Sequence, residues 1–219
     1  MINVAVVLSG CGVYDGAEIY ESVLTLMQLD KHEVNVQAFA PDIPQAHVIN
    51  HLTGEPMAGE SRNVLVEAAR IVRGEIKALS EANADEFDAV IVPGGFGAAK
   101  NLSGFAFDGA EMSVNPEFLA FANAMHAAKK PIGVICIAPA MAAAICGDGV
   151  KCTIGCDQDT ATALAAMGAE HCDRNVDEVC VDEANQLVTT PAYMLAENIS
   201  QAAQGIFKLV DQVVAMAKS

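Results

Sequence analysis

The chain alternates short apolar runs with longer segments whose apolar residues recur at helical spacing. A continuous apolar run of about five residues is typical of a strand that is buried on both faces of a parallel sheet. The strands predicted in this way lie at residues 3–8, 33–40, 88–92 and 131–135, of which 33–40 (EVNVQAFA) is interrupted by polar residues. The helical segments lie at residues 17–29, 63–73, 115–128 and 159–167. Strands that alternate with helices predict an α/β fold, in which a doubly wound, mostly parallel, flavodoxin-like sheet is sandwiched by helices.

The last part of the chain departs from this alternation. Two short apolar runs, 179–181 and 187–190, flank a polar turn, and this arrangement predicts a C-terminal β-hairpin. Residues 194–217 then predict a long closing helix. Between the second and third strands, a loop and helix excursion occupies about 41–80. No repeat or low-complexity linker interrupts the chain, so we expect residues 1–219 to form a single domain.

The first helical segment combines one apolar face with two acidic residues. Its apolar residues recur at helical spacing: Ile19, Val23, Leu26 and Met27. We expect this face to pack on the sheet. Glu18 and Glu21 then lie in the first two turns, close to the carboxyl end of the first strand.

The composition argues against several classes of partner and location. A formal net charge of -16 and a pI near 4.5 disfavour binding to nucleic acid or to an anionic membrane, because both require basic patches. The apolar N-terminus has no basic segment and is too short to span a bilayer, so we interpret it as a buried strand and not a signal peptide. Seven scattered cysteines indicate free thiols in a reducing compartment. We therefore expect a cytoplasmic protein.

Cys136 ends the fourth apolar run, and an alanine-rich segment with Pro139 in its first turn follows at once. A strand, a single nucleophile and a helix in this order predict a nucleophile elbow, in which the reactive side chain lies above the carboxyl edge of the sheet. The backbone N–H groups that follow face the same point and stabilise a thiolate there. The alternative is that Cys136 is a small buried core residue, as most free cysteines are.

Two glycine-rich loops follow strands at the same predicted edge. Gly94 and Gly95 end the third strand, and their backbone amides can approach a negatively charged oxygen, as an oxyanion site requires. The alternative is a tight turn without a ligand. The loop from Gly10 to Gly16 misses the dinucleotide-binding spacing by one residue, and it contains Cys11, a second candidate nucleophile.

The excursion contains two histidines, His47 and His51, at a spacing that suits a metal if the segment is helical, with Glu55 close behind. No third ligand is evident in the sequence, so a polar loop or lid is the favoured interpretation. The cysteine pairs later in the chain lack C-x-x-C spacing. We expect no metal site, and keep His51, Glu18 and Cys11 as lesser candidates for the active site.

Five blocks in the same order resemble the ThiJ/PfpI superfamily of class I glutamine amidotransferase-like folds, and most closely its ElbB-like glyoxalase branch. The blocks are LSGCGVYDGAEIYESVLTL (8–26), VINHLTGE (48–55), VPGGFGAAKNL (92–102), CIAPA (136–140) and TTPAYM (189–194). The resemblance covers nearly the whole chain. It implies that Cys136 is the reactive residue, that Glu21 contacts its sulfur, and that the protein is a homodimer.

The sequence departs from the wider superfamily in one respect. Many relatives have a histidine beside the nucleophile, whereas Ile137 follows Cys136 here and residues 153–156 contain none. His171, with Asp173 two residues later, lies outside the matching position. A Cys-His-acid triad is therefore not expected.

The resemblance implies a cofactor-independent, glutathione-independent glyoxalase that converts a small dicarbonyl, such as glyoxal, to the 2-hydroxy acid, glycolate. Cys136 would add to the aldehyde as a hemithioacetal, and Glu21 would move the proton between the carbons. The amides of Gly94, Gly95 and Ile137 are the candidates for holding the oxygen. The alternatives are a redox-responsive protein or a deglycase that uses the same cysteine and, third, a glutaminase-like amidotransferase subunit.

Overall fold

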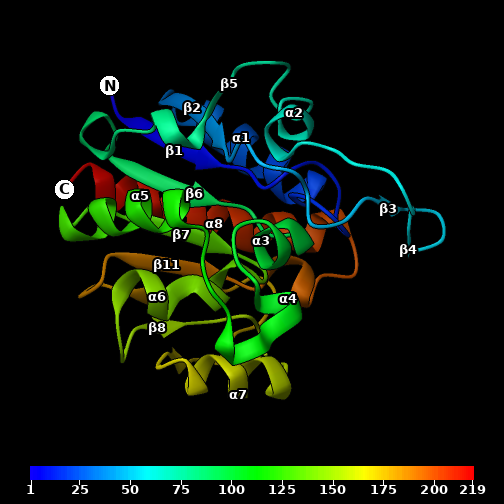
Figure 1. Cartoon of the computed structure of the whole chain (residues 1–219). Coiled ribbons are helices and arrows are strands. Elements are labelled where there is room, and N and C mark those ends of the chain that lie inside the picture. The colour runs from blue at the N-terminus through cyan, green and yellow to red at the C-terminus, as the bar shows by residue number, and fades with distance from the viewer.

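A seven-stranded sheet lies at the centre of the computed structural model, which describes residues 1–219 (Figure 1). Its order is β10-β11-β7-β6-β1-β2-β5, and every neighbouring pair is parallel except β10 and β11. The strands are β1 (Asn3–Val7), β2 (Asn35–Ala40), β5 (Ile76–Ala78), β6 (Ala89–Val92), β7 (Ile132–Ile135), β10 (Cys180–Asp182) and β11 (Leu187–Thr190). The predicted doubly wound, mostly parallel sheet and its C-terminal hairpin are confirmed.

Helices cover both faces of this sheet, and each face buries its own apolar cluster. One face carries α1 (Ile19–Lys31), α2 (Val64–Ala68) and α8 (Ile199–Ala217). The other carries α3 (Phe96–Lys100), α5 (Pro116–Ala127) and α6 (Ala142–Cys146). The short α4 (Phe105–Asp108) and α7 (Gln158–Ala166) lie near the lower end in Figure 1, with the small sheet of β8 (Lys151–Cys152) and β9 (Glu170–His171). None of the helices combines the length and apolar character needed to cross a membrane.

The closing helix begins later than predicted. Residues 192–194 form a short 3-10 turn, and α8 starts at Ile199. The side chain of Asn198 accepts a hydrogen bond from the N–H of Gln201 and so caps the helix. The separate turn carries Tyr193 back toward the carboxyl ends of β1 and β6, where the candidate site lies.

The predicted packing face of α1 is wrong at three of its four residues, because only Leu26 packs against the core. Ile19, Val23 and Met27 are 42%, 47% and 41% exposed. The buried residues are Glu21, Ser22, Leu24, Thr25 and Leu29. Helical periodicity alone identifies an apolar stripe without showing which stripe faces the core. Here the burial of Glu21 fixes the rotation of the helix and leaves its second apolar stripe exposed.

The excursion over 41–80 holds a small hairpin rather than a helix around its histidines. β3 (Ile49–Asn50) and β4 (Glu55–Pro56) pair antiparallel and project from the body of the molecule (Figure 1). His47 and His51 therefore do not share a helix face, and the spacing that suits a metal in a helix has no such meaning here. The expected helix over 63–73 is regular only in α2, and turns carry the chain on to β5.

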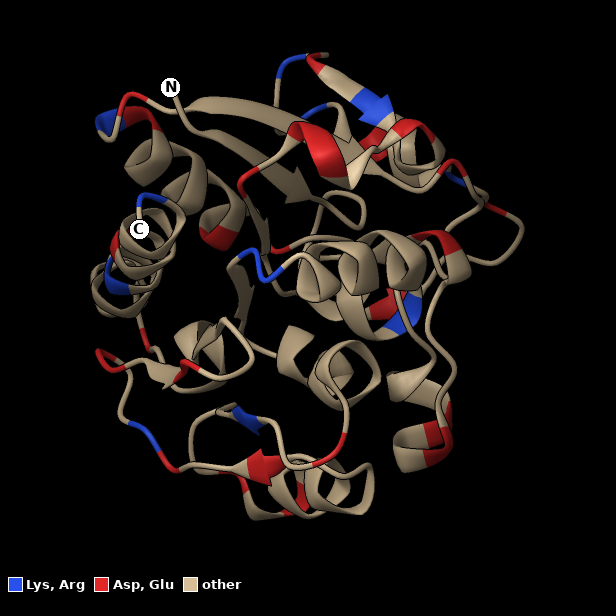
Figure 2. Cartoon of the chain, turned by 90° about the vertical axis from the view of Figure 1, so that its left-hand side faces the viewer, with Lys and Arg blue, Asp and Glu red and all other residues tan.

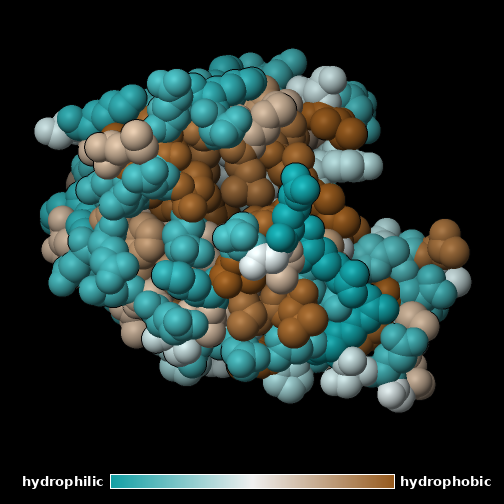
Figure 3. Space-filling model, turned by 90° about the horizontal axis from the view of Figure 1, so that it is seen from above, coloured by the Kyte–Doolittle hydropathy of each residue, from teal (hydrophilic) through white to brown (hydrophobic).

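The surface reflects the acidic composition. Asp and Glu residues outnumber Lys and Arg around the molecule (Figure 2), in keeping with the net charge of -16. Seen from above, hydrophilic residues cover much of the face, and hydrophobic residues gather toward its middle (Figure 3).

Candidate active site

Cys136 occupies a sharp turn between β7 and the helical turns that follow it. Its φ of 63° lies in the left-handed region, which costs a non-glycine residue energy and is typical of a nucleophile elbow. Its N–H donates to the carbonyl of Thr190 at the end of β11 (3.0 Å), so the neighbouring strand holds the turn in place. A 3-10 turn over 138–141 and then α6 complete the elbow.

The loop after β6 lies directly against this turn. A Cβ atom on Gly94 would collide with Cys136 Cβ and would lie 2.7 Å from Glu21 Oε2, so only glycine fits there. Gly95 has a φ of 92°, and a Cβ at this position would meet the backbone of Gly16 and Glu18. The two glycines therefore allow the loop, the elbow and the start of α1 to approach at backbone distance.

Glu21 reaches the same point from the first turn of α1 and is fully buried. Its Oε2 accepts a hydrogen bond from the N–H of Gly94 (2.9 Å), and its Oε1 accepts one from the N–H of Tyr193 (3.2 Å). Its carboxyl group also lies within hydrogen-bonding reach of the Cys136 thiol. The fold thus brings Glu21 and Cys136 side by side, and the role of the pair stays a prediction.

The three predicted amide donors have different partners. The N–H of Gly94 is occupied by Glu21, and the Gly94 carbonyl accepts from the N–H of Glu18 (3.0 Å). The amides of Gly95 and Ile137 face the Cys136 sulfur, where they favour a thiolate. Gly95 and Ile137 are thus placed to stabilise charge at the sulfur and at an atom bonded to it, whereas Gly94 positions Glu21.

Burial controls the protonation of this pair. Burial, and secondarily the negative charge of Glu18, raises the pKa of Glu21 to about 8, against the hydrogen bonds that it accepts. Burial and an ionised Glu21 also raise the pKa of Cys136, which differs from the expectation of a stabilised thiolate. Glu21 is therefore protonated at neutral pH and can donate a hydrogen bond to the sulfur. In this form it carries no negative charge that would disfavour a thiolate at Cys136.

A cavity of about 350 Å³ opens beside Cys136. Its wall consists mainly of apolar side chains and contains Glu18 as its one carboxyl group: Val13, Glu18, Gly95, Phe96, Ala99, Phe105, Ala106, Cys136, Ile137, Thr160, Tyr193 and Met194. Glu18 caps α1 by accepting a hydrogen bond from the N–H of Glu21 (2.7 Å), and burial raises its pKa. Glu21 itself lies behind Cys136, outside the wall.

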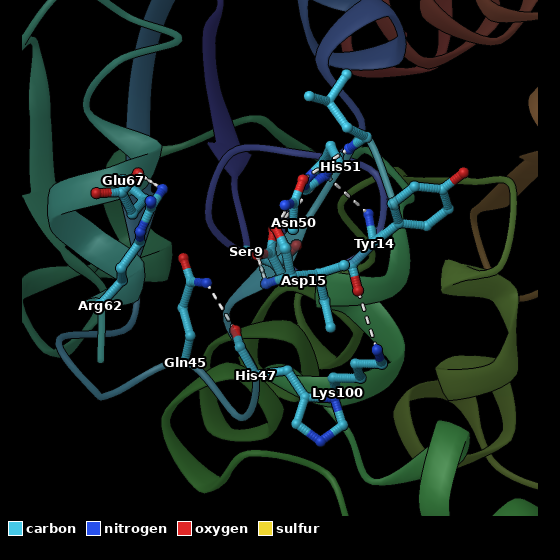
Figure 4. Close-up of polar contacts among 12 residues, drawn as sticks. Ser9, Tyr14, Asp15, Gln45, His47, Asn50, His51, Arg62, Glu67 and Lys100 are labelled. Carbon is cyan, nitrogen blue, oxygen red and sulfur yellow. Dashed lines mark hydrogen bonds and ion pairs between the residues drawn. The ribbon is translucent and has the colours of Figure 1, made fainter. Parts of the chain in front are cut away.

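Of the lesser candidates, Glu18 lines the cavity, whereas Cys11 and His51 lie outside its wall. Cys11 lies in the first glycine loop toward Glu67 and Arg70, and burial raises its pKa. His51 accepts a hydrogen bond from the N–H of Tyr14 (3.3 Å), and its ring lies 5.0 Å from the Tyr14 ring (Figure 4). Figure 4 also shows His47 pointing away from His51.

No histidine lines the cavity, and no group of three or more His, Cys, Asp or Glu side chains is arranged to hold a metal ion. His171 is engaged elsewhere, because its Nε2 accepts a hydrogen bond from the N–H of Ile154 (3.2 Å). A histidine base for Cys136 is thus absent from the geometry, in agreement with the departure seen in the sequence.

Sequence reasoning missed the role of the turn after β11. The TTPAYM block was evident as a motif, but only the fold shows that the Tyr193 N–H holds Glu21 and that the Tyr193 side chain lines the cavity. The aromatic wall formed by Phe96 and Phe105 was also missed. Phe96 follows the double glycine directly, which is the one signal in the sequence that could have indicated it.

Comparison with known proteins agrees with this geometry. The pattern of the DJ-1/PfpI family matches residues 11–197. The chain belongs to the DJ-1/PfpI family. The human mitochondrial glutamine amidotransferase-like class 1 domain-containing protein 3 is 49% identical, and the match covers 97% of this chain and 82% of the relative. The rat mitochondrial ES1 protein homolog is also 49% identical, over 97% of this chain and 83% of the relative.

A solved structure extends the comparison with the DJ-1/PfpI family to three dimensions. The crystal structure of an isoprenoid biosynthesis protein with an amidotransferase-like domain from Ehrlichia chaffeensis superposes with a TM-score of 0.91. It is 38% identical, and the match covers 99% of each chain. The α/β sheet sandwich is therefore shared with that protein.

The expectation of a cytoplasmic location is wrong. The relatives from human, rat and zebrafish are all named as mitochondrial proteins, and they point to a mitochondrial location. The expectation depended on scattered free cysteines and on the apolar N-terminal strand. Free cysteines indicate only that a disulfide framework is absent, so they do not distinguish between compartments that lack one.

The raised pKa of Glu21 predicts how stability depends on pH. The folded state binds the Glu21 proton more tightly than the unfolded state, in which the pKa of this group is near 4.5. The protonated carboxyl group therefore contributes to the free energy of unfolding in full below about pH 4.5, and this contribution is lost as pH rises to about 8. Glu21→Gln removes this dependence of stability on pH. It also leaves one of the two N–H donors without an acceptor, which lowers the free energy of unfolding by about 1–3 kcal/mol. The variant should be less stable than wild type near pH 5, with a deficit that narrows toward pH 8.

Urea unfolding of both proteins at several pH values measures this deficit. The exposed Glu55→Gln is the matched control, and it should change the free energy of unfolding by about 0.5 kcal/mol or less. A Glu21→Gln deficit that stays constant or grows with pH would show that Glu21 is ionised in the folded protein.

Proposed function

We propose that this protein is a cofactor-independent glyoxalase of the ElbB-like branch, which converts glyoxal-type dicarbonyls to 2-hydroxy acids. The observation that carries the proposal is the fully buried Glu21 carboxyl group beside Cys136, at an elbow that borders a cavity, where burial raises the pKa of Glu21 to about 8. Such a pair can exchange one proton between an acid and a nucleophile at neutral pH. The DJ-1/PfpI family includes enzymes, which is consistent with a catalytic role.

The first step uses Cys136 as the nucleophile. Glu21 donates its proton to the aldehyde oxygen as the sulfur adds to the aldehyde carbon, and the thiol proton leaves to water. The product is a hemithioacetal, and Glu21 is left as a carboxylate. The amides of Gly95 and Ile137 stabilise negative charge at the sulfur and on the oxygen that develops beside it. No metal, nucleotide or external thiol is required for this addition.

The second step moves a proton between the two carbons. Glu21 contacts the sulfur, and the carbon of the hemithioacetal lies one bond from that sulfur, so the carboxylate reaches the C–H group without lining the free cavity. It removes the proton to give an enediol and returns it to the neighbouring carbon. The carbon bonded to sulfur becomes a thioester, and the neighbouring carbonyl carbon becomes an alcohol. Water then releases glycolate from glyoxal and restores the thiol.

The competing functions use the same site. A redox-responsive protein or a deglycase would also rely on Cys136, whereas a glutaminase would need a base at the nucleophile, and no histidine lines the cavity. The raised pKa of Cys136 favours a thiol that is activated by its partner during the reaction over one that is permanently ionised for oxidation.

We also propose that the protein acts as a homodimer joined through α1. Its exposed apolar residues form one stripe: Ile19, Tyr20, Val23 and Met27. Two copies related by a twofold axis can cover this stripe with itself, so that no second surface is needed. The stripe carries no acidic side chain, which allows contact despite the net charge of -16. The family resemblance supports the same assembly.

Cys136→Ala should abolish turnover of glyoxal measured without glutathione, because the mechanism uses no other nucleophile. Cys11→Ala is the control, since Cys11 lies outside the cavity, and it should retain turnover within about twofold. Loss of activity in the Cys11 variant alone would contradict the elbow assignment. Absence of turnover in the wild type, with rapid peroxide modification of Cys136, would favour the redox alternative.

Glu21→Gln should lower kcat on the order of a hundredfold or more, as removal of a general base usually does. Glu18→Gln should cost less, because Glu18 lines the cavity without contacting the sulfur. Steady-state rates with glyoxal decide between the two. If Glu18→Gln has the larger effect, the proton transfer belongs to Glu18.

Val23→Asp should convert the dimer to a monomer, because it places a charge within an apolar interface on an acidic protein. Val66→Asp is the control, since Val66 is 61% exposed on α2, away from the stripe. Sedimentation equilibrium measures the mass of each variant. A dimeric Val23→Asp protein, or a monomeric wild type, would contradict the proposed interface.

A further inference from the structure

The cavity beside Cys136 is much larger than glyoxal. Its volume of about 350 Å³ equals that of about a dozen water molecules in the liquid, at roughly 30 Å³ each. Glyoxal has four non-hydrogen atoms and fills the space of about two or three waters. A substrate of that size would leave most of an apolar cavity wet or empty, and would gain little of the binding energy that the wall can supply.

The wall has the chemistry of a site for an apolar group. Phe96 and Phe105 contribute aromatic rings, while Val13, Ala99 and Met194 contribute aliphatic surface. Flat aromatic groups bury a large area against such walls and stack on rings at an offset or edge-on. Small alanine side chains beside the phenylalanines leave the space that such a group needs.

The positions of these residues give the cavity a direction. Gly95 and Ile137 are next to the sulfur, and they mark the end at which the aldehyde reacts. Phe96 follows Gly95 directly in the chain, and Phe105 comes from the separate helix α4. A reacting dicarbonyl held at Cys136 can therefore extend its substituent toward these two rings.

The charges beside the cavity disfavour an anionic substituent. Glu18 is the one carboxyl group in the wall, and no Lys, Arg or His lines it. Lys100 is not among the lining residues: its ammonium group lies over the Phe96 ring (5.0 Å) and donates a hydrogen bond to the Tyr14 carbonyl (3.0 Å). The net charge of -16 further opposes the approach of phosphorylated or carboxylated dicarbonyls.

We propose that the preferred substrates are neutral 2-oxoaldehydes that carry a bulky apolar group, with the arylglyoxals as the class and phenylglyoxal as the simplest member. This inference rests on the proposed glyoxalase function and adds the substituent that the cavity selects. The aldehyde carbon bonds to Cys136, and the aryl ring lies between Phe96 and Phe105.

The reaction balances without an external oxidant. Phenylglyoxal and one water give mandelate and a proton. The C–S bond forms at the aldehyde carbon and breaks on hydrolysis of the thioester. The aldehyde carbon is oxidised to the carboxylate level while the ketone carbon is reduced to the alcohol, by transfer of a proton within the substrate.

The test compares kcat/KM of the wild-type protein for phenylglyoxal and for glyoxal under identical conditions, with Cys136→Ala as the blank. A single methylene in an apolar pocket changes kcat/KM by about 10–200-fold, so an aryl group should favour phenylglyoxal on the order of tenfold or more. Turnover of glyoxal with an equal or higher kcat/KM would overturn the substrate class and leave the glyoxalase function intact. Turnover of neither dicarbonyl would overturn both.

A second variant tests whether the cavity causes the preference. Ala106 is exposed and borders the cavity, so Ala106→Phe should fold and fill part of the space. It should lower the ratio of kcat/KM for phenylglyoxal over glyoxal on the order of tenfold. Ala110→Phe, nearby but outside the lining, is the control and should leave the ratio unchanged. An unchanged ratio in Ala106→Phe would show that the aryl group binds elsewhere.

Discussion

Burial of the Glu21 carboxyl group against Cys136 is the constraint that organises this structure. A buried carboxyl is tolerated only where its oxygens accept hydrogen bonds, and two backbone N–H groups, from Gly94 and Tyr193, meet that need. Three segments that are distant in the sequence must therefore converge on one side chain. The loop after β6, the turn after β11 and the start of α1 are fixed relative to one another by this requirement.

The same constraint explains two features that are unfavourable by local rules. Helix α1 leaves an apolar stripe exposed, because the rotation that buries Glu21 also turns Ile19 and Val23 outward. Cys136 adopts a left-handed backbone conformation, which costs energy in isolation. Local rules are broken most often where a site demands it, and here both exceptions meet at the pair of Glu21 and Cys136.

The electrostatics of the pair follow from its surroundings. Burial favours the neutral form of each group, so the folded protein holds a proton on Glu21 that an exposed glutamate would lose at neutral pH. Two backbone amides face the sulfur and favour its ionised form, which burial opposes. The fold thereby keeps a carboxyl group and a thiol side by side, and the apolar cavity next to them strengthens every charge interaction made there.

The sequence by itself determined the α/β fold, the position of Cys136 at the end of a strand and the hairpin at the C-terminus, because each depends on a local pattern of apolar residues, turns and spacing. Motif resemblance added the partnership of Glu21 and Cys136. Only the tertiary structure decided four other features. They are the rotation of α1, the hairpin around His51, the different hydrogen-bond partners of Gly94 and Gly95, and the cavity lined by Phe96 and Phe105. These features depend on which segments pack together, and the spacing of apolar residues along one segment does not show which other segments will pack against it.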